Sequence, residues 1–338
     1  MRIKYRVSSL LGAILKIMRC RSLFFLLILL SPILSFSQEK KVVLIILDGI
    51  PADELEKAQT PNLDKISKLG GYARAYTGGE KGGPSETPTI SAVGYNSLLT
   101  GTWANKHNVW DNDIAAPDYS YWTIFRMMRE AKPKSKLAIF STWEDNRTKL
   151  LGEGLNETGN LKLDFIFDGF EKDTLTYPHD LDKEYIRKID NLVSFEAAHI
   201  LKTEAPDLSW VYLEFTDDMG HRFGKSPQLT SAIELADEQV GRIWEAVQAR
   251  EKNYGEEWLI WITTDHGRKA PDFKDHGGQS DSEREIWMVT NAKNLNDRFR
   301  SGKAAMVDIL PSLIDFLDIS VPDVKRKNWD GSSLLERK

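Results

Sequence analysis

The sequence predicts an α/β domain in which helices flank a doubly wound, mostly parallel β-sheet. Continuous runs of β-branched and other apolar residues at 42–47, 210–215 and 258–263 are typical of strands that are buried on both faces. Segments with helical periodicity separate these runs, and alternating strands and helices indicate a parallel sheet. Each run is followed within two residues by Asp, which places acidic groups at the carboxyl ends of strands. Ligands bind at that edge in open α/β sheets.

The first helix is predicted over 61–69. Thr60 can cap it, a proline suits its first turn, and apolar residues recur at helical spacing. Gly70 and Gly71 are expected to end the helix. Residues 78–88 are rich in Gly and Pro and are predicted to form a loop.

The rest of the chain continues the alternation. Further strands are predicted at 137–140 and 286–289, and a long helix is predicted from 229 to about 250. Residues 150–185 form the least regular stretch, and we expect them to contribute a small cap. No internal repeat divides the chain, so residues 38–338 are expected to form one domain.

The first 37 residues have the pattern of an export signal. Six basic residues and no acidic residue precede or border the apolar run 23–30, and small residues two positions apart end at Ser37. The pattern predicts cleavage after Ser37 and a periplasmic or extracellular protein. An uncleaved anchor is the alternative, but the apolar run is short and is followed by Pro32. Contact with a membrane is expected only through this signal.

Composition excludes several classes of protein. Cys20 is the only cysteine, which excludes a disulfide framework and a zinc site made of thiolates. Any metal site must therefore use His and carboxylate ligands. The formal net charge of −5 argues against a nucleic-acid partner. The oligomeric state is not determined by the sequence.

Three strand ends offer the same ligand chemistry. Because the carboxyl ends of parallel strands meet at one edge of a sheet, six side chains could converge there. They are Asp48, Asp217, His221, Asp265, His266 and His276. Carboxylate and imidazole ligands suit zinc, and two ions about 4 Å apart suit displacement at phosphorus. Each motif alone is weak, and the hypothesis rests on their conjunction. His107, His179 and His199 lack such a context, and the last two are expected at the surface or in packing.

The motifs and their order resemble the alkaline phosphatase superfamily, and within it the type I phosphodiesterase/nucleotide pyrophosphatase branch. Asp48 is followed by Thr-Pro-Asn-Leu at 60–63, by Asp-x-x-Gly-His at 217–221, by Asp-His-Gly at 265–267 and by His-Gly at 276–277. The resemblance covers nearly the whole predicted mature chain. It implies an alkaline phosphatase-like fold and a phosphoric ester hydrolase that uses two zinc ions per chain.

The resemblance also assigns roles to residues. In this family a Thr or Ser nucleophile lies ten residues before the Gly of a Thr-Gly pair, and Thr100-Gly101 place it at Ser91. Asn112, 21 positions after Ser91, matches an Asn that donates to a phosphoryl oxygen. One zinc would be held by Asp217, His221 and His276, and the other by Asp48, Asp265, His266 and the hydroxyl oxygen of Ser91.

The nucleophile segment departs from the pattern of most relatives. They usually have Thr as nucleophile and often Pro two residues later, where this chain has Ser91 and Val93. Thr89 is the second candidate nucleophile. Ser91 would attack phosphorus and form a covalent phosphoserine, which water then hydrolyses. The alternative is a purely structural role, in which Ser91 only caps a helix that leads to Leu99.

Whether the substrate phosphate carries one ester substituent or two is the open question. Monoesterase relatives often carry Lys and Arg two positions apart after the strand that corresponds to 137–140, whereas this chain has Trp143 and Arg147 there. Trp143 and Arg147 are predicted substrate contacts, and the absence of the Lys-x-Arg pair favours a small-molecule phosphodiester or pyrophosphate. A phosphomonoester is the alternative. Arg268 and Lys106 are expected to be ordinary surface charges, with contact to the substrate anion as the alternative.

Two other functions are less well supported. A sulfatase needs Pro and Arg after its nucleophile, and the residues that follow Ser91 include neither at those positions. A non-catalytic binding protein would be expected to have lost ligands, whereas all six ligands and a hydroxyl are present.

Overall fold

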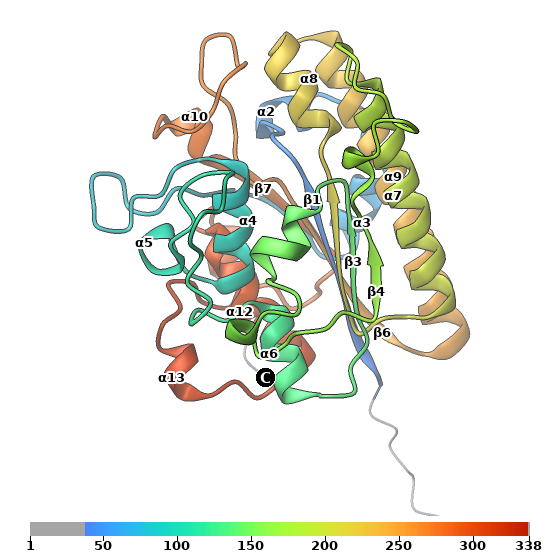
Figure 1. Ribbon diagram of the computed structural model, residues 1–338, viewed down its shortest axis with the longest axis vertical. Coiled ribbons are helices and arrows are strands. Elements are labelled where there is room, and N and C mark those ends of the chain that lie inside the picture. The colour runs from blue at the N-terminus through green and yellow to red at the C-terminus, as the bar shows by residue number, and fades with distance from the viewer. Residues whose placement is uncertain (1–37, 337–338) are drawn as a thin grey trace, which may run out of the picture. The chain divides into compact units, whose positions relative to one another are not determined.

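The computed structural model describes residues 38–336, and its centre is a seven-stranded sheet with helices against both faces (Figure 1). The strands are β1 (Lys40–Leu47), β2 (Gly71–Tyr76), β3 (Leu137–Ser141), β4 (Phe165–Phe167), β5 (Leu208–Leu213), β6 (Glu257–Thr263) and β7 (Glu285–Thr290). Their order is β2-β7-β6-β1-β5-β3-β4. Only the pairings that involve β7 are antiparallel. The predicted doubly wound, mostly parallel sheet is confirmed.

Twelve α-helices connect and cover the strands within residues 38–336. They are α2 (Ala52–Leu55), α3 (Pro61–Leu69), α4 (Ser91–Thr100), α5 (Ala104–His107), α6 (Ile124–Ala131), α7 (Glu184–Thr203), α8 (Phe215–Phe223), α9 (Pro227–Tyr254), α10 (Asp281–Arg284), α11 (Asp297–Arg300), α12 (Ile309–Leu317) and α13 (Asp323–Arg326). The strand predicted to end at residue 215 stops at Leu213, because Phe215 already begins α8. Strand β2 and helix α7 were not predicted.

The alternation of side chains along β1 sets the position of Asp48. Val42, Leu44 and Ile46 pack on the face that α4 and α12 cover, whereas Val43 and Ile45 pack on the face of α3, α7 and α9. Because side chains alternate along a strand, Asp48 continues the first set and lies toward α4. The carboxylate is therefore buried beneath that helix, where it is 1% exposed.

Helix α3 is capped by a residue that lies far from it in the sequence. The expected cap by Thr60 is wrong, because its side chain makes no capping hydrogen bond. The carboxylate of Asp237 on α9 instead accepts from the backbone N–H of Asn62 at 3.1 Å and of Leu63 at 2.8 Å. Asp237 also accepts from Nδ2 of Asn62 at 2.9 Å. The N-terminus of α3 is thereby fixed against α9.

The export signal predicted at 1–37 lies outside the described residues. Within the irregular segment 150–185, β4 pairs in parallel with β3 and extends the sheet edge. A separate cap in that segment stays a prediction.

Among the helices of residues 38–336, none combines the length and apolar character needed to cross a bilayer.

We expect Asp237→Ala to lower the free energy of unfolding by about 2 kcal/mol, because several donors at the start of α3 lose their acceptor. Urea denaturation monitored by circular dichroism measures the change. The matched control is Glu238→Ala, since Glu238 is the next residue of the same helix and is exposed. Equal stability of the two variants would contradict this account of the cap.

Candidate active site

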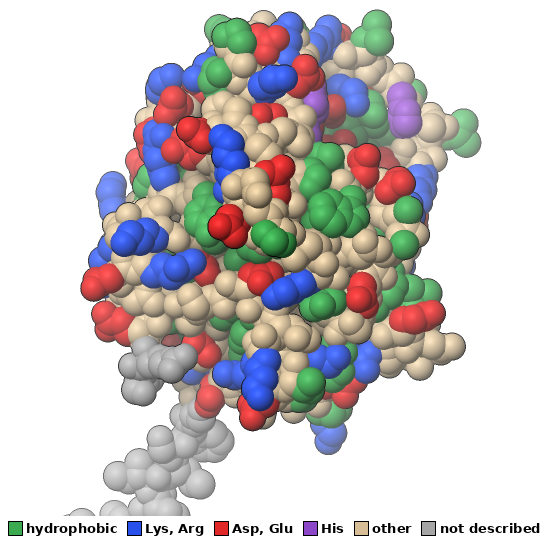
Figure 2. Space-filling view, turned by 90° about the vertical axis from the view of Figure 1, so that its left-hand side faces the viewer, with side chains coloured by type: hydrophobic (Ala, Val, Ile, Leu, Met, Phe, Trp, Pro, Cys, Tyr) green, Lys and Arg blue, Asp and Glu red, His purple; other side chains and the backbone are tan. Residues whose placement is uncertain are grey.

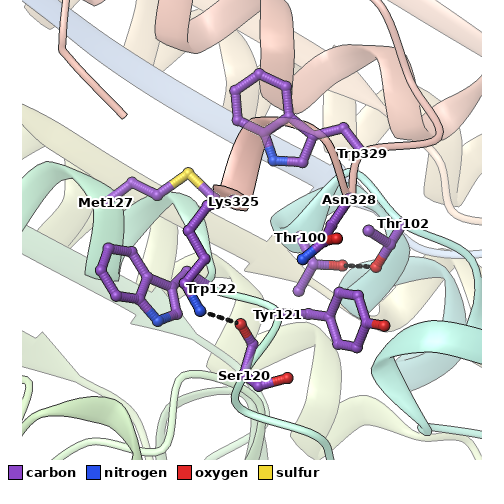
Figure 3. Close-up of a pocket in the computed structure, with 9 residues that line it drawn as sticks. All are labelled: Thr100, Thr102, Ser120, Tyr121, Trp122, Met127, Lys325, Asn328 and Trp329. Atoms are coloured by element: carbon purple, nitrogen blue, oxygen red, sulfur yellow. Dashed lines mark hydrogen bonds between the residues drawn. The ribbon is translucent and has the colours of Figure 1, made fainter. Parts of the chain in front are cut away.

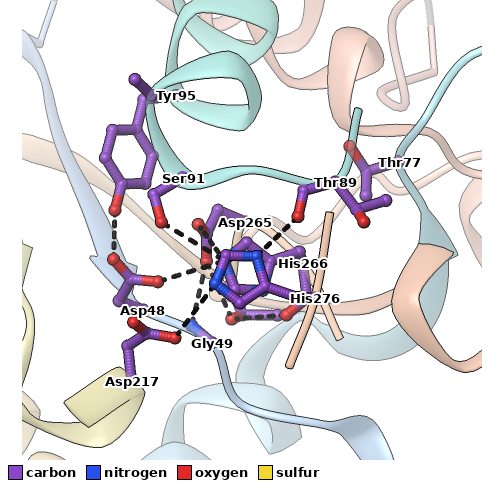
Figure 4. A network of polar contacts seen from close by, with 12 residues as sticks. Asp48, Gly49, Thr77, Thr89, Ser91, Tyr95, Asp217, Asp265, His266 and His276 are labelled. Carbon is purple, nitrogen blue, oxygen red and sulfur yellow. Dashed lines mark hydrogen bonds and ion pairs between the residues drawn. The ribbon is translucent and has the colours of Figure 1, made fainter. Parts of the chain in front are cut away.

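The six predicted ligands meet at the carboxyl edge of three adjacent strands. Figure 4 labels Asp48, Asp217, Asp265, His266 and His276 among them. Asp48 directly follows β1, and Asp265 and His266 follow β6. Asp217 and His221 lie one turn apart on α8, which begins directly after β5. His276 lies in the loop between β6 and α10, and its ring stacks on His266 with centroids 3.6 Å apart. The convergence follows from the order β6-β1-β5.

The inner group of the site surrounds Nε2 of His266. This nitrogen lies 3.1 Å from Oδ2 of Asp265 and 3.5 Å from Oδ1 of Asp48. The hydroxyl oxygen of Ser91 lies 3.3 Å away. Nδ1 of the same ring contacts the carbonyl of Gly267 at 3.0 Å, and a carbonyl only accepts, so this nitrogen carries the proton of the neutral ring. Nε2 therefore turns a lone pair toward two carboxylate oxygens.

The inner group needs positive charge at its centre. Oδ1 of Asp48 and Oδ2 of Asp265 are buried and have no hydrogen-bond donor among the described residues. Burying such acceptors without a partner costs free energy, and more so when they are charged. Two carboxylate oxygens, an imidazole nitrogen and a hydroxyl oxygen are ligands that suit a zinc ion. The inner group could therefore hold a metal ion.

The outer group consists of Asp217, His221 and His276, whose ligand atoms lie within 4.8 Å of one another. Nε2 of His221 lies 3.2 Å from Oδ2 of Asp217 and 3.1 Å from Nε2 of His276. Nδ1 of His276 donates to the carbonyl of Thr89 at 2.8 Å, so Nε2 of its neutral ring is again free to accept. The side chain of His221 is 44% exposed, which makes this group the one open to solvent.

Burial contributes to every pKa shift in the two groups, and the neighbouring charges decide how far and in which direction each pKa moves. Burial, with the neighbouring carboxylates of Asp265 and Asp217, raises the pKa of Asp48 well above its usual value. Burial likewise raises the pKa of Asp265 to about 7 and lowers the pKa of His266 well below its usual value. Burial opposes ionisation of Asp217, but the charges of Arg268 and the histidines hold its pKa below the usual value.

Ser91 is the hydroxyl that faces the inner group. It is the first residue of α4, where the helix dipole favours negative charge, and it is 7% exposed. Gly94 lets α4 approach closely, because a Cβ there would lie 3.1 Å from Cβ of Asp265. The hydroxyl of Thr89 is engaged elsewhere: it donates to the carbonyl of Gly278 and accepts from the N–H of Gly277. The contacts favour Ser91 over Thr89 as nucleophile.

Asn112 lies beside the start of α4. Its Oδ1 accepts from the backbone N–H of Ala92 at 3.0 Å, and Nδ2 has no partner among the described residues. The amide nitrogen is therefore free to donate to a bound anion next to Ser91.

The helix-cap alternative for Ser91 does not apply, because α4 has no side-chain cap.

The two predicted substrate contacts lie in different surroundings. Trp143 is half-buried and packs edge-on against Tyr95, with ring centroids 6.5 Å apart. Arg147 forms two hydrogen bonds with Asp168, at 2.7 and 3.0 Å, and also binds Glu153 and Glu144. Three carboxylates thus occupy its guanidinium, and these bonds favour a structural role for Arg147 over a substrate contact.

Arg268 corrects an expectation from the sequence. It is not a surface charge but is fully buried, and it binds the carbonyls of Gly49, Lys274 and Asp217 as well as the carboxylate of Asp217. Gly49, at φ 63°, leaves room for it, since a Cβ there would lie 2.7 Å from Nη2 of Arg268. Arg268 ties the loop after β1 to α8. Lys106 binds Asp330 at 2.5 Å.

Two tyrosines were missed by the sequence analysis. Tyr95 and Tyr212 both donate to Oδ2 of Asp48. The helical spacing of four between Ser91 and Tyr95 could have identified the first, because such residues share one helix face. Tyr212 carried no such signal, because it lies within an ordinary apolar strand.

A separate cavity lies near the other end of α4 (Figure 3). Its volume is about 10 Å³, enough for one water molecule. The lining residues are Thr100, Thr102, Ser120, Tyr121, Trp122, Met127, Lys325, Asn328 and Trp329. It is too small for a substrate and includes none of the residues of the inner or outer group.

Comparison with known proteins identifies relatives of this chain. A family model described as type I phosphodiesterase / nucleotide pyrophosphatase matches residues 42–306. A venom phosphodiesterase from Naja atra is 23% identical over 249 residues, which are 69% of this chain and 26% of the relative. The human ectonucleotide pyrophosphatase/phosphodiesterase family member 7 is 23% identical over 261 residues, 72% of this chain and 51% of the relative. The chain thus spans about a quarter to a half of the length of these relatives.

Solved structures show the same fold. Murine ectonucleotide pyrophosphatase/phosphodiesterase 5 is 15% identical, with a TM-score of 0.54, and the match covers 88% of this chain and all of that one. The phosphonate monoester hydrolase of Agrobacterium radiobacter is 16% identical, with a TM-score of 0.56, and the match covers 87% and 76% of the two chains. The fold predicted from the motifs is therefore confirmed.

We expect added zinc to stabilise the protein, because an ion that binds only the folded state raises the free energy of unfolding by about 2.7 kcal/mol at 100 times its Kd. Calorimetry with zinc or with a chelator measures the shift of the unfolding midpoint. His266→Ala should reduce the shift, whereas His199→Ala, an exposed residue of α7, should not. An unchanged midpoint in the unsubstituted protein would count against a metal site.

Proposed function

Because the chain belongs to the type I phosphodiesterase/nucleotide pyrophosphatase family, we propose that it is a metal-dependent phosphoric ester hydrolase whose nucleophile is Ser91. One observation carries the proposal. The hydroxyl of Ser91 and two buried carboxylate oxygens without donors, from Asp48 and Asp265, converge on Nε2 of His266. A cation and an oxygen nucleophile side by side are what displacement at phosphorus requires.

Two zinc ions per chain would be held by the two groups. Asp48, Asp265, His266 and Ser91 would hold one ion, and Asp217, His221 and His276 would hold the other. Asp217 also lies within reach of Asp48 and His266. We assign it to the outer group because it contacts His221 at 3.2 Å, whereas Asp265 is nearer to His266. When bound, such ions lower the pKa of a coordinated hydroxyl or water and polarise a phosphoryl oxygen.

The residues of the chain would perform the reaction in two displacements. The oxygen of Ser91 forms a bond to phosphorus while the bond to the leaving ester oxygen breaks, and a phosphoserine results. Water then attacks the same phosphorus and releases Ser91. The start of α4 would stabilise the charge on the phosphoryl group, and Nδ2 of Asn112 would donate to a nonbridging oxygen.

The charges near the site favour a diester or pyrophosphate as substrate. A phosphomonoester carries two negative charges and rewards further free cations. Arg147 is occupied by three carboxylates, and Arg268 is occupied by Asp217 and three carbonyls. Trp143 would pack against the second substituent at its half-exposed side.

Partners and location complete the proposal. The ligand would be a small-molecule phosphate ester outside the cytoplasm, in agreement with the predicted export signal. On the face that presents α5 and the loop before α4, basic and acidic side chains are intermixed (Figure 2). That face offers no continuous basic surface of the kind that binds nucleic acid.

A substrate panel tests the class of ester. Nitrophenyl phosphate, bis-nitrophenyl phosphate, nitrophenyl thymidine phosphate and nitrophenyl sulfate are offered with and without a chelator. We expect the two diesters to be hydrolysed fastest, and the chelator to abolish turnover. Preference for the monoester would replace the diester assignment by a phosphatase, and preference for the sulfate would overturn the proposal. Zinc binding without turnover of any of them would indicate a binding protein.

We expect Ser91→Ala to lower kcat by at least about 10³-fold, because the nucleophile is lost. Ser91→Thr keeps a hydroxyl and should retain measurable turnover. Zinc content, measured by atomic absorption, should remain near that of the unsubstituted protein in both variants. Full activity of the alanine variant would show that another group attacks phosphorus.

A further inference from the structure

The carboxylate of Asp48 is held in a single orientation by two tyrosines from different elements. We propose that Tyr95 and Tyr212 are positioning residues that turn Oδ1 of Asp48 toward the metal ion of the inner group. This inference rests on the proposed function, because it assigns a purpose to groups that surround the proposed metal ligands.

Both tyrosine hydroxyls donate to the same carboxylate oxygen of Asp48. Tyr212 donates to Oδ2 of Asp48 at 2.7 Å, and Tyr95 donates to it as well. The two tyrosines are 2% and 0% exposed, and their ring centroids lie 5.0 Å apart. Oδ1 receives no donor among the described residues and lies 3.5 Å from Nε2 of His266. One oxygen thus accepts two hydrogen bonds, and the other is left free on the side of the inner group.

The fold places these hydroxyls by simple register. Tyr212 lies opposite Ile46 in the parallel pairing of β5 with β1. Ile46 is two residues before Asp48, so the side chains lie on the same face of the sheet. The backbone of Asp48 is fixed too, since its carbonyl accepts from Oγ1 of Thr216 at 2.5 Å. Strand β5 and the start of α8 therefore both hold Asp48.

Tyr95 reaches the same oxygen of Asp48 from helix α4. It lies four residues after Ser91 on α4, so the two side chains share one face of the helix. Its hydrogen bond therefore links the helix that carries the proposed nucleophile to the strand that carries a proposed ligand. Removal of this hydroxyl should disturb Ser91 as well as Asp48, whereas removal of the Tyr212 hydroxyl should disturb Asp48 alone.

The experiment removes one hydroxyl at a time. Tyr95→Phe, Tyr212→Phe and the double variant are compared with the unsubstituted protein, and zinc affinity is measured by competition with a chromophoric chelator. Residues that orient metal ligands typically contribute 10–100-fold to affinity, so we expect a loss of about that size in each single variant and a larger loss in the double variant. At saturating zinc, Tyr95→Phe should lower kcat more than Tyr212→Phe does, because Tyr95 also links Asp48 to the helix that carries Ser91.

Tyr119→Phe is the matched control. Its hydroxyl donates to the carbonyl of Lys149 at 2.6 Å, so the same chemical change removes a hydrogen bond outside the proposed metal groups. This variant should bind zinc with unchanged affinity. Circular dichroism checks that every variant folds.

The outcomes separate the two levels of inference. Unchanged zinc affinity in both variants, with zinc-dependent hydrolysis intact, would overturn the positioning role and leave the proposed function standing. Failure of the unsubstituted protein to bind zinc or to hydrolyse any ester would overturn both. Loss of folding in both variants would assign the hydroxyls to stability and would likewise overturn the positioning role.

Discussion

The electrostatic cost of gathering three carboxylates at one buried edge is the constraint on which the site depends. Asp48, Asp217 and Asp265 follow adjacent strands, and two of them are 1% exposed. Like charges at such distances cannot all be ionised without positive charge beside them. Within residues 38–336, Arg268 is the buried cation that contacts one of them directly. Among the residues that the structure describes, the remaining charge has no counterpart, and this imbalance favours a cation site over a structural ion pair.

The carboxylates are bound by two kinds of donor, which are neutral groups and one cation. Tyr95, Tyr212 and the N–H of Gly49 bind Asp48 or Asp265 on the oxygen that faces away from the inner group. These neutral donors orient a carboxylate without neutralising it. Arg268 binds Asp217 and so both orients and partly neutralises it. The inner group therefore keeps more negative charge available to an ion than the outer group does.

The sequence predicted what local pattern controls and missed what distant contacts control. The strands and the six ligands were predictable, because apolar runs end in Asp and parallel strands end at one edge. The cap of α3 was not, since Asp237 is supplied by a helix about 175 residues further along the chain. The buried place of Arg268 was equally hidden, because an arginine after a turn gives no sign of the room that Gly49 leaves for it. Strand β2 pairs antiparallel with β7, a partner that its own six residues do not reveal.

The two groups also differ in burial, so that the inner group lies at the closed end of the site and the outer group at the end open to solvent. His266 is 0% exposed, Ser91 is 7% exposed and the side chain of His221 is 44% exposed. A phosphoryl group bound against the proposed nucleophile Ser91 would therefore approach past the outer group, since the sheet and α4 bury the inner one. In-line displacement places the leaving oxygen opposite the attacking one. If Ser91 attacks from the closed end, the leaving group would point toward solvent and toward α8. Selectivity for that group would then be set by α8 and the loops around it, whereas the sheet edge would fix the reaction itself.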